Sequence, residues 1–71
     1  MRLNFDEATI ILNKAKEQVK ENKGYRLGQA IWNLLPDEIA NEHRASDVDF
    51  FYWTDDERVL NVFFFSNFYI I

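Results

Sequence analysis

The side chains best suited to chemistry in this 71-residue chain are its only histidine, His43, and a group of carboxylates that follows it. A metal site would need His43 to combine with Asp47 and Asp49. One histidine and two loop carboxylates are a poor ligand set for zinc or iron. We therefore interpret His43 as a partly buried residue at the end of a short helix, and we expect no metal site.

The carboxylates between residues 47 and 57 lack the spacing of a calcium loop or of a catalytic pair. A calcium loop places carboxylates at alternating positions around a central glycine, but this stretch has no glycine and four aromatic residues interrupt it. A general acid–base pair also needs a concave pocket, which a domain this small rarely builds. We interpret the group as helix caps and solvated turns, with the alternative of an anionic surface for a basic partner: Asp47, Asp49, Asp55, Asp56 and Glu57.

Motifs for covalent chemistry or for nucleotide binding are missing from the sequence. The chain has no cysteine, which excludes disulfides and thiolate metal sites. It has no G-x-S-x-G motif, and its two glycines do not form a phosphate-binding loop. We expect no catalytic residue and no cofactor, and we do not expect an enzyme.

Aromatic residues gather toward one end of the chain, where nine of the twelve lie within residues 50–71. Neither a helix nor a hairpin in this region could turn all of these rings inward. Interface cores are enriched in aromatic residues, so the surplus predicts a contact surface for another protein. The predicted anchors are Trp53, Phe65, Tyr69 and, half exposed on an earlier helix, Trp32.

Charge is divided unevenly between the two halves of the chain. Residues 1–35 carry six basic and four acidic side chains, whereas residues 36–71 carry two basic and eight acidic ones. A net charge of −6 in the second half would attract a basic protein and repel nucleic acid. We expect an acidic rim beside the aromatic anchors, formed by Asp47, Asp49, Asp55 and Asp56.

Two amphipathic helices are predicted in the first half, over residues 5–22 and 25–35. The first has an N-cap at Asn4, and Gly24 follows its end in a position suited to left-handed backbone. The second carries apolar residues at helical spacing. Gly28 lies inside it and is expected to allow close approach of the first helix.

The second half is predicted to contain a short helix and a longer aromatic one. Pro36 suits the first position of a helix over residues 37–43. Thr54 and Glu57 match a capping box ahead of a helix from Asp55 to about Phe68. The alternative is a hairpin with strands near 49–53 and 58–65, which the aromatic and β-branched residues favour.

Together these elements predict a mainly α, three- to four-helix domain spanning residues 1–71, with an α+β fold that packs a C-terminal β-hairpin on two helices as the alternative. The start of the chain does not resemble a secretory signal, and the longest apolar run, 62–65, is too short to span a membrane. We expect a cytoplasmic protein. The core candidates are Phe5, Ala8, Leu12, Ala15, Leu27, Ile31, Leu34, Ile39, Leu60, Phe63 and Phe64.

Residues 24–56 carry GYRLGQAIWNLLP, an amphipathic acidic stretch, and then Asp-Val-Asp-Phe-Phe-Tyr. This segment resembles small phage and prophage proteins built around a G-Q-A-x-x-N-x-L core and a D-x-F-Y element. The resemblance implies an accessory protein that binds and redirects or inhibits a host protein in the host cytoplasm. It covers under half of the chain, and its motif consists mainly of helix-packing residues.

The function expected from these observations is non-catalytic protein binding. An alternative is a structural subunit that forms homo-oligomers, with the same aromatic surface closing a symmetric dimer. A third, weaker hypothesis is nucleic-acid binding, because a helix–glycine–helix arrangement is similar to a helix-turn-helix. The phosphate contacts would come from Lys14, Lys16, Lys20, Lys23 and Arg26, although a solvated basic face is the favoured interpretation of these residues.

Overall fold

The computed structural model describes residues 2–65, which form four helices and no β-strand. They are α1 (Phe5–Glu21), α2 (Leu27–Leu34), α3 (Asp37–His43) and α4 (Asp56–Phe65). The prediction of a small, mainly α fold is confirmed, and the hairpin alternative is not supported. The part of the predicted last helix that reaches Phe68 lies outside the described residues.

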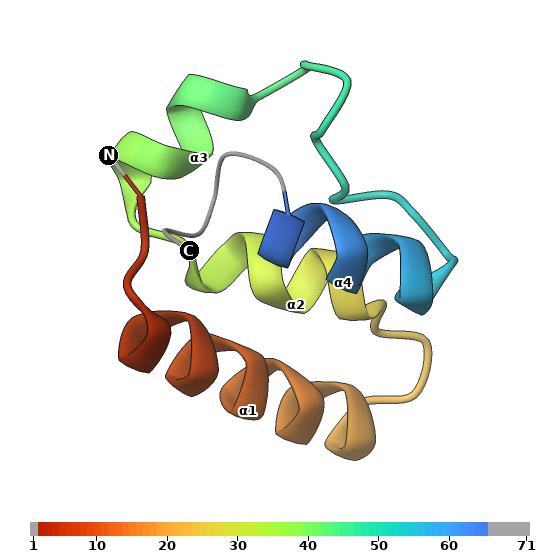
Figure 1. Cartoon of the computed structure of the whole chain (residues 1–71). Coiled ribbons are helices and arrows are strands. Elements are labelled where there is room, and N and C mark those ends of the chain that lie inside the picture. Colours follow the sequence, from red (N-terminus) through yellow and green to blue (C-terminus); the bar gives the residue numbers. More distant parts are fainter. Residues whose placement is uncertain (1, 66–71) are drawn as a thin grey trace.

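Helix α2 lies between α1 and α4 and packs on both of them (Figure 1). Helices α1 and α2 run antiparallel, and a long connection joins α3 to α4. Ile39 and Ala40 of α3 belong to the same buried core as residues of α1 and α2. The buried residues of α2 (Leu27, Gly28, Ala30, Ile31 and Trp32) make up most of its length, which is expected for a helix covered on two sides. Among residues 2–65, no helix is both long and apolar enough to cross a membrane.

The first helix begins as its sequence predicts. Asn4 is the N-cap, and its Oδ1 accepts a hydrogen bond of 2.8 Å from the Glu7 N–H. The Asn4 N–H donates in return to Glu7 Oε1 at 3.0 Å, which completes a capping box. Leu3 and Ala8, which flank this box at the two positions of a hydrophobic staple, are both fully buried. Gly24 is left-handed with φ 81°, as expected, and lies two residues after the C-cap Asn22.

The predicted range of α3, 37–43, is confirmed, whereas the predicted start of the last helix is off by one residue. Pro36 is the N-cap of α3 rather than its first helical residue. The predicted N-cap of the last helix, Thr54, is also wrong. The Asp55 carbonyl accepts the first helical hydrogen bond, from Val59, and Asp55 Oδ1 accepts from the Arg58 N–H at 3.3 Å. These two bonds make Asp55 the N-cap of α4.

Most predicted core residues are buried. Ala8, Ala15, Leu27, Ile31, Ile39 and Phe63 belong to the core, and Leu12, Leu34, Leu60 and Phe64 pack against it half-buried. Phe5 is a wrong prediction, since 64% of its surface is exposed. The buried stripe of α1 is centred on Ala8, Ile11 and Ala15, and Phe5 lies at its edge in the first turn.

Gly28 allows a close approach, but the neighbour is not α1 as predicted. A Cβ at position 28 would overlap the backbone carbonyl oxygen of Phe50 and lie 3.3 Å from Val59 Cγ2. The glycine therefore lets the connection between α3 and α4, and α4 itself, rest directly on the backbone of α2.

Candidate functional site

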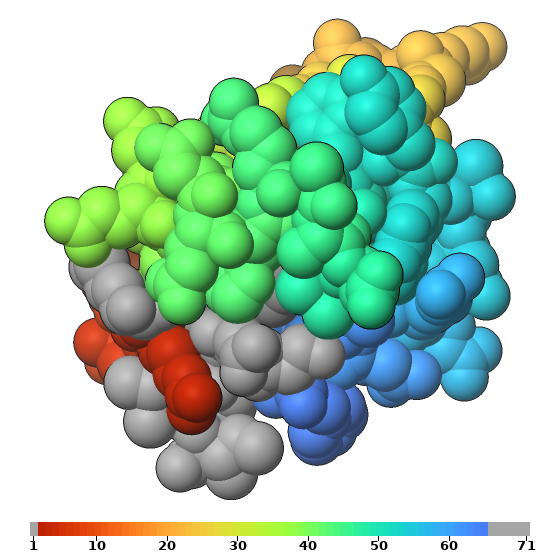
Figure 2. Space-filling view, turned by 90° about the horizontal axis from the view of Figure 1, so that it is seen from above, coloured from red at the N-terminus to blue at the C-terminus, as the bar shows by residue number. Residues whose placement is uncertain are grey.

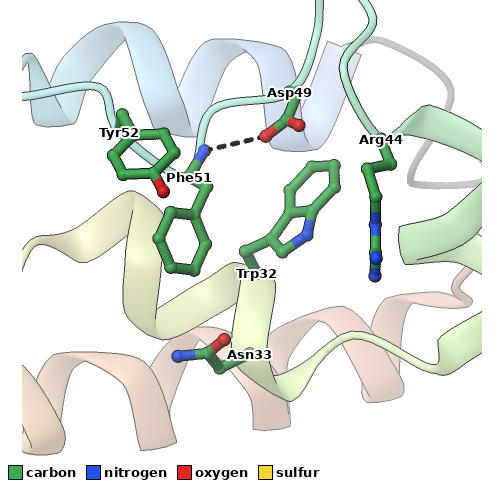
Figure 3. A pocket seen from close by; sticks show the side chains of 6 residues that line it. All are labelled: Trp32, Asn33, Arg44, Asp49, Phe51 and Tyr52. Carbon is green, nitrogen blue, oxygen red and sulfur yellow. Dashed lines mark hydrogen bonds between the residues drawn. The ribbon is translucent and has the colours of Figure 1, made fainter.

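The connection between α3 and α4, residues 44–55, is ordered by its own polar groups. The Asp49 carboxylate accepts a hydrogen bond from the Ala45 N–H at 2.7 Å and another from the Phe51 N–H at 3.2 Å (Figure 3). Ser46 Oγ donates to the His43 carbonyl at 2.6 Å, which ties the connection to the end of α3. Short side chains that bond nearby backbone in this way fix the course of a turn without regular secondary structure.

Phe50 fastens this connection to the core. Its side chain is fully buried and is surrounded edge-on by three rings. The centroid distances are 5.3 Å to Trp32, 6.3 Å to Trp53 and 6.4 Å to Phe63. Edge-to-face pairs at such distances add to the stability that burial alone provides.

The two residues after Phe50 turn toward solvent. Phe51 is half-buried, Tyr52 is 78% exposed, and their ring centroids lie 4.7 Å apart. The Arg26 guanidinium lies 5.5 Å from the centroid of the Tyr52 ring, and Arg26 Nε donates a long hydrogen bond of 3.5 Å to the Phe51 carbonyl. Arg26, the N-cap of α2, thus contacts the Tyr52 ring and the backbone of Phe51.

These side chains border an open groove of about 300 Å³. Figure 3 shows Trp32 in the middle, with Phe51 and Tyr52 on one side and Arg44 on the other. Asn33 and Asp49 complete the lining. The groove therefore joins α2 to the connection, and its position follows from the anchoring of Phe50. Figure 2 shows α3 and the connection, in green to cyan, covering one face of the molecule.

The predicted aromatic anchors are distributed between core and surface. Phe65 is 75% exposed at the end of α4, and Trp53 is half-buried beneath the Arg58 guanidinium, 4.1 Å from its ring centroid. The expectation of a half-exposed Trp32 is wrong, because only 7% of this residue is exposed. Its ring packs on Phe50, which the helical pattern of α2 alone cannot reveal. Tyr69 lies outside the described residues.

The predicted acidic rim is also divided. Asp47 is exposed in the connection, and Asp55 and Asp56 are exposed at the start of α4. Asp49 differs from them because both of its oxygens bind backbone N–H groups of the connection. The structure thus brings Asp49 to the groove and places the other three carboxylates outside the groove lining.

Four groove residues were not among the predicted site residues: Asn33, Arg44, Phe51 and Tyr52. Asn33 and Arg44 come from two helix ends whose proximity no local pattern reveals. The turn at Asp49 could be expected from the sequence, because an aspartate side chain often accepts a hydrogen bond from the backbone N–H two residues later, here that of Phe51. That turn directs Phe50 inward and leaves Tyr52 outside.

The side chains that line the groove are suited to non-covalent contacts. His43 lies at the end of α3, as expected, but it is buried rather than partly buried, with 6% of its surface exposed. Within residues 2–65, no group of three histidine or carboxylate side chains is arranged to hold a metal ion. The groove offers aromatic surface, one guanidinium, one amide, the Asp49 carboxylate and a tyrosine hydroxyl.

Asp49 should contribute measurably to stability. We expect Asp49→Ala to lower the free energy of unfolding by about 1–3 kcal/mol, because it removes the acceptor of two backbone N–H groups. Asp47→Ala is the matched control, since this exposed carboxylate accepts no hydrogen bond from residues 2–65 and should change stability by less than about 0.5 kcal/mol. Urea denaturation measures both. Equal effects would show that Asp49 does not hold the connection.

Comparison of the chain with protein-family models, with curated proteins and with solved structures finds no match in any of the three.

Proposed function

We propose that this chain is a non-catalytic protein-binding module, and that its contact face is centred on Tyr52 and the groove beside it. The observation that carries the proposal is the 78% exposure of Tyr52 on an ordered connection. A large ring in such a position offers contact area at a low cost in conformational entropy on binding. The neighbouring Phe51 and the groove extend the same apolar surface.

The charge of the molecule supports a partner with a basic surface. Residues 36–71 carry a net charge of −6, and Asp47, Asp55 and Asp56 are exposed on either side of the aromatic residues in sequence. Charges at the rim of an interface speed encounter with an oppositely charged partner and make the rate sensitive to salt. They add less to the final affinity than the buried rings do.

The sequence resemblance to phage accessory proteins extends this proposal to a biological setting. In that setting the chain binds a host protein in the host cytoplasm and inhibits or redirects it. The small size of the chain and its exposed aromatic surface are compatible with such an inhibitor or adaptor.

Self-association is the second candidate function, and Phe65 is the observation that favours it. This ring is 75% exposed at the end of α4, and a two-fold contact between two copies would cover it. Nucleic-acid binding has less support. In a helix-turn-helix the second helix enters the groove of DNA, and five of the eight residues of α2 are buried here.

A pair of matched substitutions tests the proposed face. Tyr52→Ala should weaken capture of the partner by about tenfold or more, as expected for a central aromatic anchor. Phe65→Ala removes an equally exposed ring elsewhere and should leave capture unchanged. Affinity capture with mass spectrometry identifies the partner, and titration of the purified partner then gives the dissociation constants.

The outcomes separate the two candidate functions. If Phe65→Ala abolishes a dimer seen by sedimentation while Tyr52→Ala changes nothing, the self-association hypothesis replaces the proposed one. If neither variant changes capture while circular dichroism shows both folded, the proposed contact face is wrong.

A further inference from the structure

The two sides of the groove differ in chemistry. Phe51 and Tyr52 form an apolar side, and Arg44 faces them across Trp32 (Figure 3). A ligand that fills this space must therefore present an apolar group to one side and a hydrogen-bond acceptor to the other.

The charge of Arg44 is available to such a ligand. Its exposed guanidinium makes no hydrogen bond or ion pair with any of residues 2–65. Arg26 and Arg58 are different, because their guanidinium groups lie over the rings of Tyr52 and Trp53. A guanidinium presents its N–H donors in a fork that matches the two oxygens of a carboxylate.

Asp49 lies in the groove lining but does not pair with Arg44. Each of its oxygens accepts a hydrogen bond from a backbone N–H, one from Ala45 and one from Phe51. These bonds hold the carboxylate toward its own backbone. Arg44 is thus the charged lining group left to meet a ligand.

We infer that the groove receives the carboxyl-terminal residue of a partner chain, with its free carboxylate on Arg44 and a large apolar side chain against Phe51 and Tyr52. This inference rests on the proposed protein-binding function. The groove volume of about 300 Å³ is at the small end for ligand pockets and suits one large residue. A chain terminus carries both required groups on that one residue, whereas an internal aspartate or glutamate carries no apolar side chain of its own.

The groove has acidic surroundings. Asp47, Asp55 and Asp56 are exposed and lie outside the groove lining, so salt weakens their repulsion of a carboxylate ligand. Asp49 lines the groove, and the two backbone N–H groups that donate to its carboxylate partly offset its charge. The same surroundings favour a partner whose residues before the terminus are basic. The groove and the rim would then recognise different parts of one tail.

The minimal probe is N-acetyl-phenylalanine, compared with its C-terminal amide, in a titration followed by the NMR signals of the Trp32 indole N–H and the backbone amides of 44, 51 and 52. We expect saturable binding of the acid with a dissociation constant of about 1–10 mM, and binding of the amide weaker by about tenfold. Arg44→Gln should reduce the affinity for the acid to that of the amide. Lys14→Gln, which removes a positive charge on α1, should change neither.

Two results would overturn the inference: equal affinities for the acid and the amide, or no saturation by the acid up to about 20 mM. The titration and the Tyr52→Ala capture experiment test the inference and the proposed function separately. If the acid fails to bind while Tyr52→Ala still loses the partner, the contact face stands and the recognition of a terminus is wrong. If the acid binds and Tyr52→Ala retains the partner, the groove is a carboxylate site outside the partner interface.

Discussion

Gly28→Ala is expected to lower the free energy of unfolding by about 2 kcal/mol or more, although alanine is the better helix former by about 1 kcal/mol. The added Cβ would overlap the Phe50 carbonyl oxygen, which is backbone and cannot rotate away. Overpacking of this kind costs typically about 1–3 kcal/mol, and more where rigid groups meet. In a domain of this size a net loss of 2 kcal/mol lowers Tm by roughly 10 °C, which a thermal melt measures.

The other glycine is the control for this prediction. Gly24→Ala places its Cβ in open space but keeps a left-handed backbone, with φ 81°. That conformation costs an alanine about 1–2 kcal/mol by strain alone. The two variants are therefore destabilised for different reasons. A Gly28→Ala protein as stable as the wild type would show that the connection does not rest on α2.

Gly28 also shows what a sequence can and cannot predict here. A glycine inside a helical pattern indicates that another segment of the chain packs closely against the helix backbone. That part of the prediction is confirmed. The predicted neighbour is α1, which directly precedes α2 in the chain, but the observed neighbour is Phe50. The local sequence pattern does not indicate which distant segment of the chain packs against a helix.

The helices themselves were predictable because their signals are local. Asn4 and Glu7 define the start of α1, and the periodicity of apolar residues gives the extent of α1 and α2 to within two residues. The start of α4 was misplaced because Thr54 and Asp55 can both cap a helix. Both residues fit the local signal, and the hydrogen bond from the Arg58 N–H to Asp55 Oδ1 identifies Asp55 as the cap.

The candidate site was less predictable, because it lies on a connection without periodicity. The surplus of aromatic residues was evident from composition, but not the division between buried Phe50 and exposed Tyr52. That division depends on the hydrogen bonds that the Asp49 carboxylate accepts and on the rings of α2 and α4 that pack around Phe50. Whether Tyr69 adds to the contact face stays a prediction, because this residue lies outside the described ones.

The site and the core share Phe50, so the two can be lost together. We expect Phe50→Ala to lower the free energy of unfolding by about 3–5 kcal/mol, the usual cost of removing a fully buried phenylalanine. A chain of this length has a total stability of roughly 4–11 kcal/mol, so the variant should be marginally folded or unfolded. Urea denaturation followed by tryptophan fluorescence measures the loss. Trp32 and Trp53 both contact Phe50, and both should report it by a red-shifted emission.

Two control variants show whether the loss of stability in Phe50→Ala comes from its buried ring. Phe65→Ala removes an exposed phenylalanine and should change stability by less than about 0.5 kcal/mol. Phe50→Leu keeps most of the apolar volume and should cost less than about half of the alanine change, with the fold retained. In that folded variant the groove can still be tested, and a weakened response to N-acetyl-phenylalanine would show that Phe50 positions the groove as well as the core. If Phe50→Ala is as stable as Phe65→Ala, the connection is not anchored by its buried ring, and the geometry on which the contact face depends is wrong.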